Sequence, residues 1–280
     1  MSATVSPLSE NLGAIVNGVD LREPLSDADR RTLYQAFLDH HVIAIRGQDG
    51  LTPDQVLDLS RIFGPELEPH TFTEFHHPDT PLIIVLSNRV EMGGKPKGLA
   101  DAGTFWHSDV SYKEIPAKAT LLYSVEIPDQ GGDTLFCNLT AAYDALPDDM
   151  KTRLDGITAV HDYTHSKRDI LVEGKVAAPD PGTHPVVRMH AETGRKAIYI
   201  NPAYTTRINE LNEAESDALM AEIFDHCLQD QFRMTYQWQP GDVLAWDNAA
   251  IMHSATTKNL DPAKHRTLWR TIISGDGPVR

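Results

Sequence analysis

The sequence predicts a mainly β fold with flanking helices, arranged as a β-sandwich or jelly roll. Three observations lead to this fold class. Many short stretches rich in β-branched and apolar residues are separated by turn residues, few segments show helical spacing, and no repeat or linker-like composition divides the chain. We therefore expect residues 1–280 to form a single domain.

The N-terminal part is predicted to combine helices with short strands. Ser26 is the expected N-cap of a helix in which Leu33 and Phe37 recur at helical spacing. Thr52 begins a second helix with a capping box, and Gly64 is expected to end it. Short apolar runs predict strands at 13–19, 42–45 and 82–86.

Strand-like stretches dominate the remainder of the chain. Residues 87–105 come first and contain several glycines and lysines, so we expect either a lid over a binding site or an ordinary surface loop. Two helices are predicted at 140–155 and 212–229. The predicted strands are 118–126, 133–138, 185–190, 196–201, 233–237, 242–246 and 266–273.

Charge and cysteine content exclude several classes of protein. The formal net charge of -15 provides no basic face for nucleic acid or an anionic membrane surface. Cys137 and Cys227 are the only cysteines, so no disulfide framework is expected. The N-terminus does not resemble a signal peptide, and no run of about 18 apolar residues could span a membrane. We expect a cytoplasmic protein without nucleic-acid or membrane partners.

Two segments far apart in the sequence offer the ligands of a metal site. His107 and Asp109 are two residues apart, and on a strand their side chains would project from one face, roughly 6.6 Å apart along the backbone. His253 follows the predicted strand 242–246 and provides a second imidazole. Two histidines and one carboxylate are the ligand set that holds non-haem Fe(II) with coordination positions left open. The similar pairs His77-Pro78-Asp79 and His190-Ala191-Glu192 are expected on the surface.

Two arginines in the last predicted strand suggest an anion-binding site. Arg266 and Arg270 are four residues apart and face the same side of a strand. An inward guanidinium is costly to bury unless it is paired, and it can bind a carboxylate or sulfonate through two parallel hydrogen bonds. From the residues alone, an anion site and a structural salt bridge remain equally open for each arginine.

These residues resemble the TauD/TfdA family, the taurine and 2,4-dichlorophenoxyacetate dioxygenases that use Fe(II) and 2-oxoglutarate. The likeness runs nearly end to end and implies a double-stranded β-helix, which is a jelly roll. The matching segments are Gly13-Ala14, Gly18-Val19-Asp20-Leu21, Phe63-Gly64-Pro65, Trp106-His107-Ser108-Asp109, Gly131-Gly132-Asp133-Thr134, His184-Pro185-Val186-Val187-Arg188, Trp246-Asp247-Asn248, His253, and Arg266 with Arg270.

The resemblance implies a role for each site residue and three cofactors or co-substrates: Fe(II), 2-oxoglutarate and O₂. The metal ligands would be His107, Asp109 and His253. Thr134 and Arg266 would bind 2-oxoglutarate, and Arg270 would bind the anionic group of the primary substrate. The implied reaction hydroxylates a small anionic organic substrate and releases succinate and CO₂. Family members are often dimers or tetramers, so a homo-oligomer is expected.

The substrate positions depart in part from the taurine-binding members of the family. His70 and Ser166 match residues that contact the substrate, whereas Tyr204 replaces a phenylalanine. Three more positions differ: Thr73, Gly103 and Lys167. The pocket is therefore expected to differ in size and polarity. This argues against taurine and for another sulfonate, a sulfate ester or a carboxylate.

From the sequence, three alternatives to this function are open. One is a biosynthetic oxidase of the same family that acts on an amino-acid or fatty-acid derivative. Another is a zinc hydrolase, because zinc also accepts two histidines and a carboxylate. The third is a non-catalytic binding module on the same scaffold. Thr134 and Arg266 argue against a hydrolase, which needs no 2-oxoglutarate site, and the intact ligand set argues against a module without chemistry.

Overall fold

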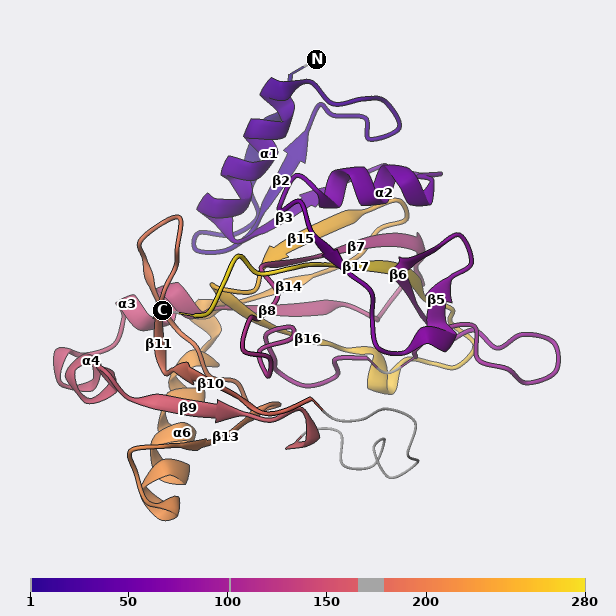
Figure 1. Ribbon diagram of the computed structural model, residues 1–280. Coiled ribbons are helices and arrows are strands. Elements are labelled where there is room, and N and C mark those ends of the chain that lie inside the picture. The colour runs from indigo at the N-terminus through magenta and orange to yellow at the C-terminus, as the bar shows by residue number, and fades with distance from the viewer. Residues whose placement is uncertain (1, 101, 166–178, 280) are drawn as a thin grey trace.

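The computed structural model describes residues 2–100, 102–165 and 179–279. Two β-sheets face each other in this structure, and helices cover their outer sides (Figure 1). The larger sheet has the strand order β1-β2-β3-β15-β7-β17-β6-β5, with β4 also paired to β17. Its strands are β1 (Thr4–Pro7), β2 (Ala14–Asn17), β3 (Val42–Ile45), β4 (Leu67–Glu68), β5 (His76–His77), β6 (Thr80–Ser87), β7 (Ala119–Glu126), β15 (Val243–Asp247) and β17 (Thr267–Ile273).

The opposing sheet has the order β14-β8-β16 and is antiparallel throughout. Its strands are β14 (Arg233–Tyr236), β8 (Thr134–Asn138) and β16 (Ile251–Ala255). Two small sheets extend it: β10-β9-β13, with β9 (Thr158–His161), β10 (Gly182–Pro185) and β13 (Thr205–Ile208), and the hairpin of β11 (Val187–Met189) with β12 (Lys196–Ile198). This arrangement agrees with the predicted jelly roll.

Alternation along the strands separates the inner core from the outer cores. In β15, Leu244 and Trp246 point into the space between the two sheets, whereas Val243 and Ala245 face the N-terminal helices. Phe136 of β8 faces the same inner space from the opposite sheet. Alternate residues along a strand therefore belong to different cores. A polar side chain at an inward position is enclosed between the two sheets.

The helices cover the two outer faces. Helices α1 (Asp27–His40) and α2 (Pro53–Ser60) pack on the larger sheet, where Leu33, Phe37 and Val56 join the outer core. Helix α6 (Glu213–Cys227) packs with α3 (Leu139–Asp144) behind the smaller sheet, and α4 (Asp148–Leu154) lies next to them (Figure 1). Short 3₁₀ turns occur at Thr73–Phe75, Tyr163–His165, Asp230–Phe232 and Thr257–Asn259.

Most predicted elements are present, and the caps at Ser26 and Thr52 are confirmed. The predicted helix 140–155 is instead two helices, because Pro147 takes an extended conformation and disfavours helix at the residue before it. The helix from Thr52 ends at Ser60, since the next turn tightens to 3₁₀ geometry before Gly64.

Strand boundaries account for the other differences. The predicted strand 185–190 is broken at Val186, where the chain leaves the partner β9 and pairs with β12 instead. The predicted strand 196–201 ends at Ile198. Seven strands escaped prediction because they are short or lack alternation: β1, β4, β5, β9, β10, β13 and β16.

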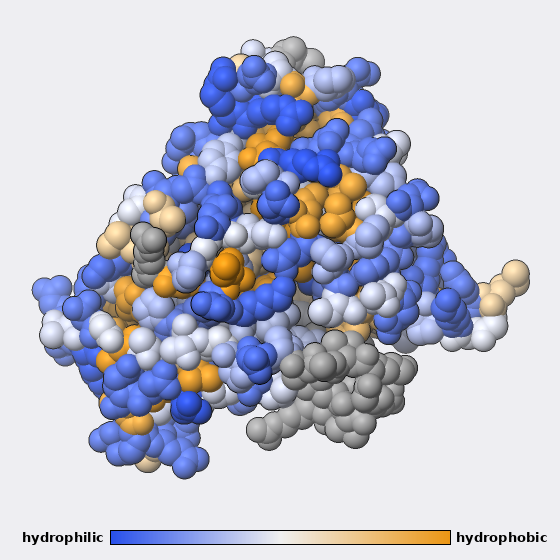
Figure 2. Space-filling view, viewed as in Figure 1, coloured by the Kyte–Doolittle hydropathy of each residue, from blue (hydrophilic) through white to orange (hydrophobic). Residues whose placement is uncertain are grey.

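Few large hydrophobic side chains of the described residues are exposed. No helix in the described parts of the chain is both long and apolar enough to cross a membrane. Figure 2 shows a mostly hydrophilic face on which hydrophobic side chains gather only in small areas. The loop after β6 projects from the body of the molecule (Figure 1). Two of its residues are largely exposed, Val90 at 63% and Met92 at 104%.

The inner core should dominate stability. Leu244 is fully buried between the sheets, so Leu244→Ala should lower the free energy of unfolding by about 2–5 kcal/mol through lost burial and a cavity. Val125→Ala, at a position that is 44% exposed in the same sheet, should change it by less than about 0.5 kcal/mol. Urea denaturation measures both. Equal effects would contradict the assignment of this core.

Candidate metal centre

Three side chains meet on the inner side of the smaller sheet. One ligand atom each from His107, Asp109 and His253 lies within 4.8 Å of the other two, and all three residues are buried. His253 belongs to β16 and lies opposite Phe136 of β8, so it faces inward. His107 joins this sheet through two backbone hydrogen bonds to His253, with N–O distances of 3.0 and 2.8 Å. The sequence prediction that these three residues approach one another thus agrees with the structure.

The local structure around Asp109 differs from the predicted strand. His107 forms an isolated β-bridge, and Asp109 lies in the turn that follows. Val110 then has a φ of 59°, which is rare for a β-branched residue. The turn places Asp109 near the histidines, so the expected proximity is reached by a turn rather than by strand alternation.

Hydrogen bonds orient the candidate ligands. The Nδ1–H of His107 donates to the Phe105 carbonyl at 2.8 Å, which leaves Nε2 facing the Asp109 Oδ1 at 3.5 Å. The His253 Nε2 lies 3.6 Å from the Asp109 Oδ2. Thr120 donates its hydroxyl to that same oxygen at 2.8 Å. Two imidazole nitrogens and a carboxylate therefore converge on one point.

The protonation states suit a cation. Burial acts to raise the pKa of Asp109, but the neighbouring His253, Arg270 and His107 outweigh it and hold that pKa well below its usual range. Burial lowers the pKa of His253 to about 3. A carboxylate that is ionised and an imidazole that is neutral are the forms that coordinate a divalent metal. The donor set therefore fits Fe(II).

A buried cationic side chain, that of Arg266, lines a cavity next to the two histidine ligands. Arg266 is 6% exposed and shares a cavity with Thr134 and His253. Its Nε donates to the Gly132 carbonyl at 2.9 Å, and burial lowers its pKa to about 10. No carboxylate of the described residues forms a salt bridge with it. An anion with a carboxylate group would supply the missing partner.

The surroundings of Arg266 explain two features of the sequence. Gly132 has a φ of 74°, and a Cβ there would lie 2.8 Å from the Arg266 Cδ, so a larger residue would displace the guanidinium. The Thr134 hydroxyl accepts a hydrogen bond from Trp238 Nε1 at 3.0 Å, which leaves its own hydrogen available. The Gly-Gly-Asp-Thr segment thus shapes this cavity.

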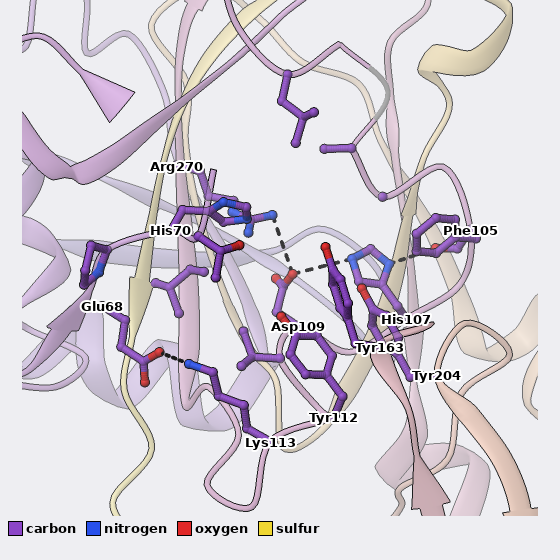
Figure 3. Close-up of a pocket in the computed structure, with 17 residues that line it drawn as sticks. Glu68, His70, Phe105, His107, Asp109, Tyr112, Lys113, Tyr163, Tyr204 and Arg270 are labelled. Atoms are coloured by element: carbon purple, nitrogen blue, oxygen red, sulfur yellow. Dashed lines mark hydrogen bonds and ion pairs between the residues drawn. The ribbon is translucent and has the colours of Figure 1, made fainter. Parts of the chain in front are cut away.

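A second pocket opens beside the ligands and contains the predicted substrate positions (Figure 3). The Arg270 Nη1 of β17 lies 3.7 Å from the Asp109 Oδ1. Its buried Nε has no hydrogen-bond partner among the described residues. His70 and Tyr204 line the same pocket. Ser166 and Lys167 lie outside the described residues.

Sequence reasoning missed the aromatic wall of this pocket. Phe105, Tyr112 and Tyr163 line it together with Tyr204, and the Tyr112 ring lies 5.1 Å from that of Tyr204 (Figure 3). At the mouth, Lys113 forms a 2.6 Å ion pair with Glu68. Tyr112 follows Asp109 by only three residues, and this short spacing could have indicated that its ring lies near the metal ligands.

The prediction of a surface role for His190 was wrong. Its side chain is buried, and its Nε2–H donates to the Asp247 carboxylate at 2.8 Å. Its Nδ1 accepts hydrogen bonds from the amides of the turn at Glu192 and Thr193. The expected turn there is present, with Gly194 at a φ of 68°, so this histidine anchors the turn to β15.

Part of the segment 87–105 contributes to the site. Leu99 continues the larger sheet by hydrogen bonds with Val85 and Ser87, and it lines the pocket with Ala102 and Gly103. The tip of the segment projects from the body of the molecule (Figure 1). Whether the segment acts as a lid stays a prediction.

Comparison with known proteins shows close relatives. Residues 4–272 match the model of the Taurine catabolism dioxygenase TauD, TfdA family. The chain is 32% identical to an alpha-ketoglutarate-dependent 2,4-dichlorophenoxyacetate dioxygenase of Cupriavidus pinatubonensis, with both chains covered completely. It is 30% identical to a pentalenolactone F synthase of Streptomyces avermitilis, over 96% of this chain and 92% of that one. A solved taurine dioxygenase from Burkholderia xenovorans superimposes with a TM-score of 0.84 at 32% identity, over 99% and 91% of the two chains.

A glycine beside His107 offers a test of the candidate centre. Gly103 has a φ of 71°, and a Cβ there would lie 2.8 Å from the His107 Cε1. Gly103→Ala should therefore displace the imidazole and weaken Co(II) binding by about tenfold or more. Gly94 also has a positive φ, of 84°, but a Cβ there would meet nothing within 4 Å. Gly94→Ala should leave Co(II) affinity unchanged. Titration of the metal-free protein measures both, and equal affinities in the two variants would contradict the placement of His107.

Proposed function

The chain belongs to the Taurine catabolism dioxygenase TauD, TfdA family, and from this premise we propose which residues perform its reaction and which substrate it takes. The protein is an Fe(II)- and 2-oxoglutarate-dependent dioxygenase. One observation supports our assignment above all: His107, Asp109 and His253 converge within 4.8 Å beside a buried arginine. That arrangement offers a metal site and an anion site side by side.

In our proposal, His107, Asp109 and His253 hold the iron. The hydrogen bonds from His107 to the Phe105 carbonyl and from Thr120 to Asp109 fix the ligand orientations before metal arrives. When bound, the iron with 2-oxoglutarate and O₂ supplies the oxidising power, and 2-oxoglutarate leaves as succinate and CO₂.

We assign the cavity at Arg266 and Thr134 to 2-oxoglutarate. Arg266 is buried without a salt-bridge partner among the described residues, so a carboxylate of the co-substrate would pair with its guanidinium. The Thr134 hydroxyl has its hydrogen available for the same carboxylate. The rigid position of Arg266, bonded to the Gly132 carbonyl, orients the co-substrate toward the metal ligands.

We assign the aromatic pocket to the primary substrate. Arg270 and His70 would bind its anionic group, while Tyr112 and Tyr204 contact an apolar or aromatic body. Lys113 at the mouth adds positive charge, although Glu68 compensates for it. We therefore propose a small carboxylate, sulfonate or sulfate ester with an apolar body. Taurine fits this pocket less well, because pairing its sulfonate with Arg270 would place its ammonium group where we expect an apolar body.

Family membership bears on each alternative function. A zinc hydrolase and a non-catalytic module both disagree with membership in a dioxygenase family. A biosynthetic oxidase is the second candidate function, because one similar protein is named as a synthase, the pentalenolactone F synthase. We also propose a cytoplasmic location and a homo-oligomer, which size-exclusion chromatography with light scattering would test.

Succinate formation tests the proposed function. Protein purified without oxygen would receive Fe(II), 2-oxoglutarate and O₂, with a panel of aryloxyacetates, alkyl sulfates, sulfonates including taurine, and amino and fatty acids. We expect an anion with an apolar body to stimulate succinate formation more than taurine does. Stimulation by taurine alone would contradict the proposed substrate class, and no succinate under any condition would contradict the proposed activity.

Arg266→Ala should separate the co-substrate site from the metal site. Loss of a buried charged partner costs about 2–5 kcal/mol, so the dissociation constant of 2-oxoglutarate should rise by roughly 100-fold. Metal affinity should change little, because Arg266 contacts none of the three ligands in the structure. Anaerobic titration measures both constants, and an unchanged 2-oxoglutarate affinity would show that Arg266 is structural.

Arg270→Ala should remove stimulation by the primary substrate. Slow succinate formation without that substrate should persist, since Arg266 and Thr134 are both retained. Arg207→Ala, at an exposed position of β13, serves as the matched control and should behave as wild type. An unchanged KM for the stimulating anion in Arg270→Ala would rule out its assigned role.

A further inference from the structure

A buried polar cluster lies directly behind the turn that carries Asp109. It consists of Ser111, His161, His184 and Asn201, each at most 2% exposed, and we call it the Ser111 cluster. None of these four residues lines the two cavities of the site. Their contact with the site is therefore indirect, through the backbone and through Ser111.

The Ser111 hydroxyl is held from two sides. The Asn201 Nδ2–H donates to the Ser111 Oγ at 3.0 Å, and the His161 Nδ1 lies 3.1 Å from the same oxygen. Because an amide nitrogen only donates, the hydroxyl hydrogen is available for His161. Ser111 lies two residues after Asp109 and one before Tyr112, so these bonds fix the turn that carries both.

His184 holds the backbone of the same turn. Its Nε2 lies 2.9 Å from the Ser111 carbonyl and 3.0 Å from the Lys113 carbonyl. Carbonyl oxygens only accept, so Nε2 carries the hydrogen and shares it between them. Gly182 approaches from the same strand, and a Cβ there would lie 2.8 Å from the Tyr112 carbonyl. Strand β10 is thus packed tightly against the turn.

Asn201 connects this turn to the opposite wall of the substrate pocket. Its Nδ2 bonds Ser111, while its Oδ1 accepts the Tyr204 amide hydrogen at 3.0 Å. The rings of Tyr112 and Tyr204 lie 5.1 Å apart on the two segments that Asn201 joins. One amide group therefore sets the position of both aromatic walls.

The turn needs such support because its backbone is strained. Val110 has a φ of 59°, and a β-branched residue in that region costs energy that surrounding contacts must offset. Without the bonds to Ser111 and Lys113, the turn could relax toward an ordinary conformation. Asp109 and Tyr112 would then move away from the other side chains of the site.

We propose that the Ser111 cluster positions Asp109 for metal binding and, through Asn201, aligns Tyr112 with Tyr204. The inference rests on the proposed function of Asp109 as a metal ligand. The four residues of the Ser111 cluster are positioning residues, since none of them touches the metal site. The cluster should affect metal affinity and the substrate pocket, and it should leave the co-substrate cavity at Arg266 unaffected.

Metal binding by four variants tests this proposal. His184→Leu removes the shared donor, whereas His184→Gln keeps an N–H donor near the same place. Ser111→Ala removes only the hydroxyl group. It replaces His184→Leu as the test if that variant does not fold. His226→Leu is the matched control, because it removes a comparable bond of 2.8 Å from a histidine to the Ala142 carbonyl, among the helices behind the smaller sheet. The measurements are the Co(II) dissociation constant, the 2-oxoglutarate dissociation constant at saturating Co(II), and the Tm without metal.

We expect His184→Leu to raise the Co(II) dissociation constant by about tenfold or more, and Ser111→Ala to raise it less. His184→Gln should recover most of the affinity, and 2-oxoglutarate binding should stay unchanged in all variants. His226→Leu should lower only the Tm. Wild-type affinity in both His184→Leu and Ser111→Ala would overturn the inference, as would equal weakening in His226→Leu. Failure of the wild-type protein to bind Co(II) would instead overturn the proposed function, and this inference with it.

Discussion

The site depends on holding one ionised carboxylate inside the sandwich. Asp109 is buried, and a buried carboxylate is costly unless charges and hydrogen bonds compensate for it. Arg270 and the two histidines hold its pKa low, and Thr120 donates to it. The same carboxylate therefore draws together the groups that a divalent cation needs. Arg266 poses the opposite problem, since it is a buried cation whose partner would arrive with the co-substrate.

The alternation of inward and outward side chains along the strands lets the fold bury these charged groups beside an apolar core. Inward positions of β7, β8, β16 and β17 contribute Thr120, Thr134, His253 and Arg270, while their neighbours in sequence face the outer cores. A sandwich built from two sheets can therefore present polar side chains from strands that are far apart in the sequence. His107 completes the set from outside the sheets, through its backbone pairing with His253. The pocket that we assign to the substrate lies where strands end and turns begin, so loop residues form its aromatic wall.

The sequence predicted the parts of the site that follow from regular structure. Strands with alternating or continuous apolar residues were predictable, and so were the capped helices at Ser26 and Thr52, because these features depend on neighbouring residues. The convergence of His107 and His253 was inferred from ligand chemistry. The turn at Asp109 was not predictable, because the residues that bond it, such as His184 and Asn201 at Ser111, are distant in sequence. The burial of His190 likewise depends on Asp247, which is distant in sequence.

A crystal structure of the protein grown without oxygen, with Fe(II) and 2-oxoglutarate, would test this account most directly. The account predicts one metal ion bounded by His107, Asp109 and His253, with a carboxylate of 2-oxoglutarate paired with Arg266. Arg270 would then remain available to the primary substrate. Metal bound elsewhere, or 2-oxoglutarate paired with Arg270 while Arg266 stays unpaired, would contradict it.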